Sequence, residues 1–141
     1  MPTLVILLSL LLSATATAIP LTLGSGGGYY VHTVVDSDVD SDMLLDTGSK
    51  YVVLSGKTFN TIKQTHTMTV VDTIRGVTAN GSVNTYTVYL LESLAVSGCV
   101  LHNVRAVLIS NSDKDILGIS ALESLSPFSV NLRESSLTVS C

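Results

Sequence analysis

One acidic residue of the sequence stands in a setting that prepares a carboxylate for chemistry. Asp46 ends the apolar run Met43–Leu45 and is followed by Thr47, Gly48 and Ser49. An apolar approach places the carboxylate at the edge of a core, where loss of water disfavours its charged form. Gly48 permits a tight turn, and the neighbouring hydroxyls can donate hydrogen bonds that fix the carboxylate. We therefore expect Asp46 to act as an acid or a base, although the same tripeptide also forms ordinary turns in β proteins.

The segments that must position this loop are mostly strands. Runs of β-branched and aromatic residues predict strands over Tyr29–Val35, Ser82–Leu91 and Val100–Ile109. Asn80-Gly81 precedes the second of these, and because both residues tolerate a positive φ they predict a tight hairpin turn. The acidic segment 36–42 is expected to be a solvated polar turn. Neither this segment nor the isolated histidines have the spacing of a metal site, so no metal is expected.

Only two short helices are expected. One covers Ala121–Leu125, where Ser120 and Glu123 fit a capping box, and the other covers Gly56–Ile62. Alternating apolar residues then predict a C-terminal hairpin over Phe128–Val139. The chain is therefore expected to be nearly all-β.

Composition restricts the class of protein. The chain has 141 residues, of which 46% are hydrophobic and 13% charged, with a net charge of −4. These values suit one folded domain and exclude a disordered chain. The seven Lys and Arg residues are dispersed, so no nucleic-acid partner is expected.

The N-terminus predicts export. The apolar run Leu4–Leu12 and the small residues Ala16-Thr17-Ala18 fit a signal peptide, residues 1–18, that is cut before Ile19. The protein is then periplasmic or secreted, with no stable membrane span after signal removal. An uncleaved signal that anchors the chain in a membrane is the alternative. Residues 19–28 are expected to be an N-terminal segment with a Gly-rich linker, and residues 29–141 the folded domain.

Two cysteines become important in an exported chain, because disulfides persist in oxidising compartments. Cys99 follows an expected turn and Cys141 is the last residue. A disulfide between them would close a loop of about 40 residues and stabilise the fold by a few kcal/mol. Two free thiols and a Cys141 bridge between two chains remain alternatives.

The segment Leu44–Ser49 resembles the active-site loop of aspartic proteases. Three other segments agree with that family in chain order: Thr78–Val83 resembles the flap, Ile116-Leu117-Gly118 a structural loop, and Phe128–Val139 the terminal hairpin. Together they resemble the small retropepsin-like members, especially exported bacterial ones. The resemblance implies an all-β, closed, barrel-like aspartic protease domain with one or two short helices.

The same resemblance implies an endopeptidase that needs no cofactor. In this family two Asp carboxylates share a proton and activate a water molecule that attacks the substrate. The sequence has a single Asp-Thr-Gly, so the second carboxylate must come from a second copy in a homodimer. Asp46 is then the catalytic acid or base, Thr47 braces the two loops, Gly48 completes the turn, and Ser49 bonds the carboxylate.

The resemblance also implies which residues meet the peptide or protein substrate. These are Lys50, after the active-site loop, and Ala79, Asn80 and Gly81 in the flap. Lys50 stands where such proteins usually have a small or acidic residue. The positive charge of this lysine would favour substrates with acidic side chains or termini. The alternative is a solvated loop lysine with no role in binding. The segments 19–23 and 137–141 are expected to interleave in the dimer. The alternative function is a catalytically silent relative that binds peptides or serves as a structural module.

Overall fold

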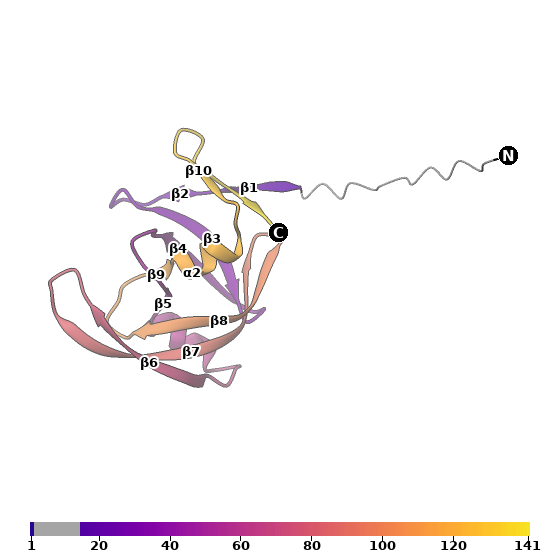
Figure 1. Cartoon of the computed structure of the whole chain (residues 1–141). Coiled ribbons are helices and arrows are strands. Elements are labelled where there is room, and N and C mark those ends of the chain that lie inside the picture. The colour runs from indigo at the N-terminus through magenta and orange to yellow at the C-terminus, as the bar shows by residue number, and fades with distance from the viewer. Residues whose placement is uncertain (2–14) are drawn as a thin grey trace.

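The computed structural model describes Met1 and residues 15–141. Most of the expected signal peptide lies outside these residues. The described chain forms an eight-stranded sheet, a three-stranded sheet and two short helices (Figure 1). The elements are β1 Ala16–Pro20, β2 Thr22–Leu23, β3 Tyr29–Val35, β4 Val39–Leu45, β5 Val52–Ser55, α1 Gly56–Ile62, β6 Thr69–Val77, β7 Val83–Val96, β8 Cys99–Ile109, β9 Asp115–Leu117, α2 Ile119–Ser124, β10 Ser129–Asn131 and β11 Ser136–Ser140. No helix in the described part of the chain is long and apolar enough to cross a membrane.

Six strands of the larger sheet close into a barrel, which confirms the expected fold class. Their order is β3-β4-β9-β5-β8-β7, and β7 returns to pair with β3 through Thr33–Val35. Alternate side chains of each strand point inward, as the period of a strand requires. Val31, Met43, Leu54 and Leu91 are fully buried in this core. The barrel gives the ends of β4 and β9 fixed positions, and the loop that carries Asp46 begins there.

Strands β6 and β7 form a long hairpin that projects from the barrel (Figure 1). The predicted hairpin is confirmed, but its turn differs from the expected two-residue type. The N–H of Thr78 donates to the oxygen of Ser82 at 2.9 Å, and only Gly81 takes a positive φ, of 83°. Three residues therefore lie inside the closing pair. The side chain of Asn80 accepts hydrogen bonds from the Thr78 hydroxyl and the Ser82 N–H, which holds this longer turn.

The acidic segment 36–42 is a turn over only its first residues, so the prediction for the rest was wrong. Strand β4 already begins at Val39, because Val39, Ser41 and Met43 alternate into the core. The exposed Asp40 and Asp42 lie beside the ring of His32, at 3.3 and 3.1 Å. The alternation that defines β4 is thus carried partly by polar side chains.

Helix α1 is confirmed at its predicted bounds, and the Ser55 hydroxyl accepts the N–H of Thr58 to cap it. The capping box predicted for the second helix was wrong. Helix α2 begins at Ile119 with Gly118 at its N-cap, and no side chain caps it. The Ser120 hydroxyl is instead buried without a hydrogen-bond partner. The N–H groups at the start of α2 bond to another loop, which is described below.

The three-stranded sheet pairs the first strand, β1, with the last strand, β11. Strand β11 lies between β1 and β10, with Ile19 opposite Leu137. Residues 16–18, upstream of the expected signal cleavage, also belong to β1. The Gly-rich segment 24–28 forms the turn between β2 and β3 rather than an extended linker, since Gly24 donates to the oxygen of Gly28 at 2.8 Å.

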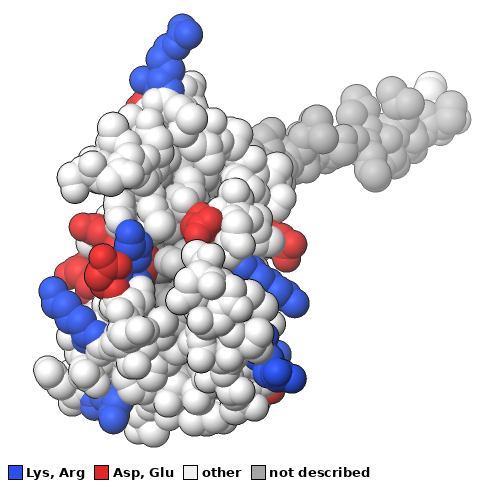
Figure 2. Space-filling model, turned by 90° about the vertical axis from the view of Figure 1, so that its left-hand side faces the viewer, with Lys and Arg blue, Asp and Glu red and all other residues white. Residues whose placement is uncertain are grey.

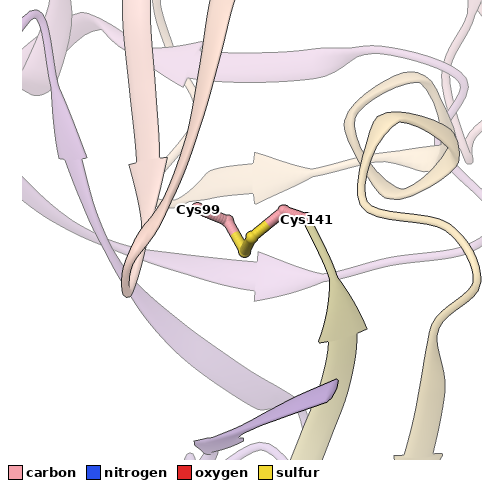
Figure 3. The surroundings of a disulfide bond; sticks show 2 residues. All are labelled: Cys99 and Cys141. Atoms are coloured by element: carbon pink, nitrogen blue, oxygen red, sulfur yellow. A yellow bond between two sulfur atoms is a disulfide. The ribbon is translucent and has the colours of Figure 1, made fainter. Parts of the chain in front are cut away.

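A disulfide fixes the end of β11 to the barrel (Figure 3). Cys141 is joined to Cys99, at the turn between β7 and β8, with 5.8 Å between the Cα atoms. Of the three alternatives for the cysteines, the structure has the bridge within one chain. The three-stranded sheet is therefore covalently tied to the larger one.

Charged side chains are scattered over the surface. On the face shown in Figure 2, broad uncharged areas separate most of them, and blue and red side chains mingle where they do gather. No patch of one sign covers that face.

Candidate active site

Asp46 directly follows β4, and its backbone is held by the neighbouring strand. Strand β4 runs parallel to β9, with Leu44 opposite Ile116 and Leu45 opposite Leu117. The N–H of Asp46 continues this pairing by donating to the oxygen of Leu117 at 3.2 Å. The position of the carboxylate therefore depends on two segments that are far apart in the sequence.

The loop 46–49 folds back on the carboxylate. The N–H of Gly48 donates to Oδ1 of Asp46 at 2.8 Å, and the N–H of Ser49 donates to the Asp46 carbonyl at 3.2 Å. The Ser49 hydroxyl donates to the oxygen of Tyr51 at 2.9 Å, so its expected bond to the carboxylate is not formed. A backbone N–H replaces it because the turn at Gly48 brings that group closest. Asp46 is half-buried and Thr47 is exposed.

The start of helix α2 holds the other side of the loop. The N–H of Ile119 donates to the oxygen of Ser49 at 2.8 Å, and the N–H of Ser120 donates to the oxygen of Lys50 at 3.0 Å. These carbonyls satisfy helix N–H groups that a capping side chain would otherwise bond. A Cβ atom on Gly118 would lie 2.7 Å from the Ser49 oxygen. Only glycine allows this close approach of the two backbones.

A groove of about 610 Å³ lies over this loop. It runs from Asp46 to the arms of the β6–β7 hairpin and is lined largely by apolar side chains. Its lining residues are Asp46, Gly48, Ser49, Lys50, Tyr51, Val53, Ile74, Arg75, Gly76, Val77, Thr78, Ala79, Tyr86, Val107, Ile109 and Ile116. An apolar groove with a few converging polar groups is the usual form of a ligand site. Asp46 therefore has both access to solvent and room for an extended chain above it.

The groove contains most, but not all, of the site residues expected from the sequence. Lys50, Ala79 and Ile116 line it, whereas Asn80 and Gly81 stand beyond it at the exposed hairpin tip. Leu117 and Gly118 are buried beneath the loop. Sequence reasoning missed Arg75, Tyr86 and the barrel residues that form the floor. It identified the hairpin arms, but no local pattern says which arm residues line the groove of Asp46.

The charges of the groove are uneven. Asp46 is its one acidic residue in the described part of the chain, and Lys50 and Arg75 are its basic residues. The Lys50 Nζ lies 5.3 Å from the centre of the Tyr51 ring, within the range of a cation–π contact. The lining of the groove therefore has two positive charges and a single carboxylate.

A buried carboxylate behind the site links the segments that carry it. Asp115 accepts hydrogen bonds from the Ser41 hydroxyl at 2.5 Å, the Ser55 N–H at 2.6 Å and the Thr58 hydroxyl at 2.5 Å. Because these donors belong to β4, β5 and α1, the carboxylate fixes β9 against all three. The sequence carries no local signal for this network, since its members come from three separate segments.

The comparisons with known proteins agree with this arrangement. The family model described as gag-polyprotein putative aspartyl protease matches residues 31–124, more than half of the chain. No curated protein sequence matches. Among solved structures, a retropepsin-like aspartic protease from Rickettsia conorii superposes with a TM-score of 0.64 at 18% identity, covering 91% of this chain and 93% of that one.

Two further solved structures share the fold. EIAV protease in complex with the inhibitor HBY-793 has a TM-score of 0.58 at 21% identity, covering 78% of this chain and 99% of its own. The retroviral protease-like domain of Ddi1 from Leishmania major has a TM-score of 0.56 at 16% identity, covering 79% and 87%. These identities show similarity of fold alone. With the family match and the closed barrel around the Asp46 loop, the chain belongs to the retropepsin-like aspartic protease family.

Proposed function

We propose that this protein is an aspartic endopeptidase that works as a homodimer. The observation that carries the proposal is the position of Asp46, half-buried at the base of a peptide-sized groove beneath a long hairpin. A carboxylate so placed can reach a bound peptide and a water molecule at the same time. The family match supports this chemistry for the loop that carries Asp46.

The requirement for a dimer follows from the chemistry. Activating water on a peptide bond needs a base for the water and an acid for the carbonyl oxygen. Asp46 alone can be only one of these at a time, and no other carboxylate of the described residues lines its groove. The partner subunit's Asp46 would supply the other, and two carboxylates held that close share one proton because they cannot both ionise.

The reaction then proceeds in two stages. The ionised carboxylate takes a proton from the water, whose oxygen bonds to the scissile carbon, while the protonated carboxyl gives its proton to the carbonyl oxygen. The carboxyl that took the water's proton then gives it to the amine nitrogen as the C–N bond of the tetrahedral intermediate breaks, and the other carboxylate takes back a proton from the intermediate's hydroxyl, so that an acid and an amine are released. The β6–β7 hairpin would cover the substrate and exclude water during these steps.

The terminal sheet is the proposed dimer contact. Signal cleavage before Ile19 would remove residues 16–18 from β1, leaving Thr138–Ser140 of β11 without a partner on that edge. An unpaired strand edge is a template for pairing with another chain. The segments 19–23 and 137–141 of two copies would interleave there. Deletion of residues 19–23 should then weaken dimerisation, and an unchanged sedimentation coefficient would contradict this part of the proposal.

Export is proposed on two grounds. The apolar run Leu4–Leu12 fits a signal peptide, and a disulfide between Cys99 and Cys141 suits an oxidising compartment. The compartment would be the periplasm or the extracellular space. N-terminal sequencing of the protein recovered outside the cytoplasm should begin at Ile19, and a protein that stays in the cytoplasm would contradict export.

The proposed function is tested with purified protein that begins at Ile19. Cleavage of an unfolded protein substrate is measured from about pH 3 to pH 7, since a shared-proton carboxyl pair works on the acidic side of neutrality. The Asp46→Asn variant should be dimeric, folded and inactive. A monomer that cleaves nothing at any pH would favour the alternative, a peptide-binding or structural β domain.

A further inference from the structure

We infer that the groove of Asp46 selects peptides that carry acidic side chains next to the cleaved bond. The inference rests on the proposed function and adds a substrate class to it. Two basic residues line the groove, Lys50 from the active-site loop and Arg75 from β6. The presence of these two positive charges in the groove is the observation that carries the inference.

Both cations are free to meet a ligand. Within the described residues neither forms an ion pair, whereas Arg105 pairs with Asp72 and Lys114 lies 4.0 Å from Asp113. Lys50 has only the ring of Tyr51 beneath its ammonium group. A peptide carboxylate would therefore not have to displace an existing partner before it bound.

The backbones of the two residues are fixed, although their side chains are exposed. The Lys50 carbonyl is held by the N–H of Ser120 at 3.0 Å, and Arg75 is paired with Thr85 across the hairpin. The two charges are therefore anchored to the loop below the substrate and to the hairpin beside it. A peptide in the groove passes between these two anchors.

The charge of the assembled site favours acidic ligands. A dimer would present two copies of each cation, against two Asp46 carboxyls that share one proton and so carry one negative charge. The rest of the lining is uncharged, which leaves the cleft with a net positive charge. Apolar walls reduce the screening of that charge by water and raise the local concentration of anionic peptides.

The experiment compares matched peptides that differ at one position. A mixed-sequence peptide library with mass-spectrometric detection first locates the cleaved bond. Peptides with Glu, Gln or Lys at each neighbouring position are then compared by kcat/KM at about pH 5.5, where a Glu side chain is ionised. Glu should exceed Gln by about threefold to tenfold at low salt and approach it at 1 M NaCl, because salt screens exposed charges.

Two variants assign the preference to the residues named. Lys50→Gln and Arg75→Gln should each lower the Glu-to-Gln ratio of kcat/KM. Lys57→Gln is the matched control, because Lys57 is an exposed lysine that lines a different, polar groove. A Glu-to-Gln ratio of one in the wild type, or a ratio unchanged in both groove variants, overturns the inference and leaves the proposed endopeptidase intact.

Binding separates this inference from failure of the proposed function. Fluorescein-labelled Glu and Gln peptides are titrated with the Asp46→Asn protein, and anisotropy gives their affinities without any cleavage. Tighter binding of the Glu peptide that is lost in the double variant Lys50→Gln/Arg75→Gln supports the inference even if the wild type cleaves nothing. Equal affinities contradict it.

Discussion

The N–H of Ile119 donates a 2.8 Å hydrogen bond to the carbonyl oxygen of Ser49, so the first turn of α2 holds the loop that carries Asp46. The same loop is paired on its other side with β9, through the Asp46 N–H and the Leu117 oxygen. Asp46 is thus positioned by backbone hydrogen bonds from one continuous segment, 117–119. Changes in that segment should alter the active site without touching the carboxylate.

The first prediction concerns Gly118, which makes the close approach of that segment possible. Gly118→Ala should lower the free energy of unfolding by about 1–3 kcal/mol, because the new Cβ would meet the backbone oxygens of Ser49 and Tyr51. Urea denaturation measures the change. Gly26→Ala is the control, since a Cβ there meets nothing within 4 Å. Equal stability of both variants would contradict the packing described here.

A second prediction concerns the buried carboxylate of Asp115. Asp115→Asn should lower the free energy of unfolding by about 2–3 kcal/mol, since the Ser41 and Thr58 hydroxyls donate to one carboxylate oxygen and the Ser55 N–H to the other, and the amide nitrogen that replaces one oxygen cannot accept. Asp113→Asn, at a side chain that is 87% exposed, should leave stability nearly unchanged. Equal free energies of unfolding for the two variants, measured by thermal or urea denaturation, would show that the network does not stabilise the fold.

The disulfide supports a third prediction. Reduction of the Cys99–Cys141 bond should lower the free energy of unfolding by about 2–4 kcal/mol, because the bond closes a long loop in the unfolded chain. Denaturation curves with and without dithiothreitol measure the change. The double variant Cys99→Ser/Cys141→Ser should be as unstable as the reduced protein and insensitive to the reductant. If the oxidised wild type is no more stable than this variant, the disulfide does not stabilise the fold.

The pH dependence of stability provides a fourth prediction. The Asp38 carboxylate, hydrogen-bonded to His66 at 2.8 Å, raises the pKa of the imidazole above its usual 6.5, partly offset by loss of water around the ring. Asp36 and Glu92 add to the rise in pKa. A raised pKa means that the folded chain binds the proton more tightly, so this contribution is present below pH 6.5 and fades as pH rises through the raised value.

Two histidine variants measure this contribution. The difference in unfolding free energy between the wild type and His66→Gln should be larger at pH 5.5 than at pH 8. His102→Gln, at an exposed position of β8, is the matched control for the loss of an imidazole. If the difference in unfolding free energy between the wild type and His66→Gln instead increases with pH, the contact with Asp38 does not stabilise the protonated imidazole.

Features carried by local sequence could be predicted. The strands β3 and β8 follow from runs of β-branched residues, and α1 occurs at its expected bounds. The Asp46 loop was recognised because its chemistry is contained in four consecutive residues. The internal disulfide was among the alternatives that the two cysteines allowed.

Features that depend on distant partners could not be predicted. The capping box at Ser120 failed because carbonyls of the loop 49–50 already bond the first N–H groups of α2. The Ser49 hydroxyl bonds Tyr51, and a backbone N–H takes its expected place at Asp46. The polar start of β4 could have been recognised from its alternation, since Val39, Ser41 and Met43 follow a period of two.

The central claim, that two copies of Asp46 form one catalytic site, is tested most directly by mixing subunits. Wild-type protein is combined with increasing amounts of the Asp46→Asn variant at constant total concentration, allowed to exchange subunits, and assayed for peptide cleavage. If only dimers with two Asp46 residues are active, the activity falls as the square of the wild-type fraction. Activity that falls in direct proportion to that fraction would show that each chain works alone and would contradict the account.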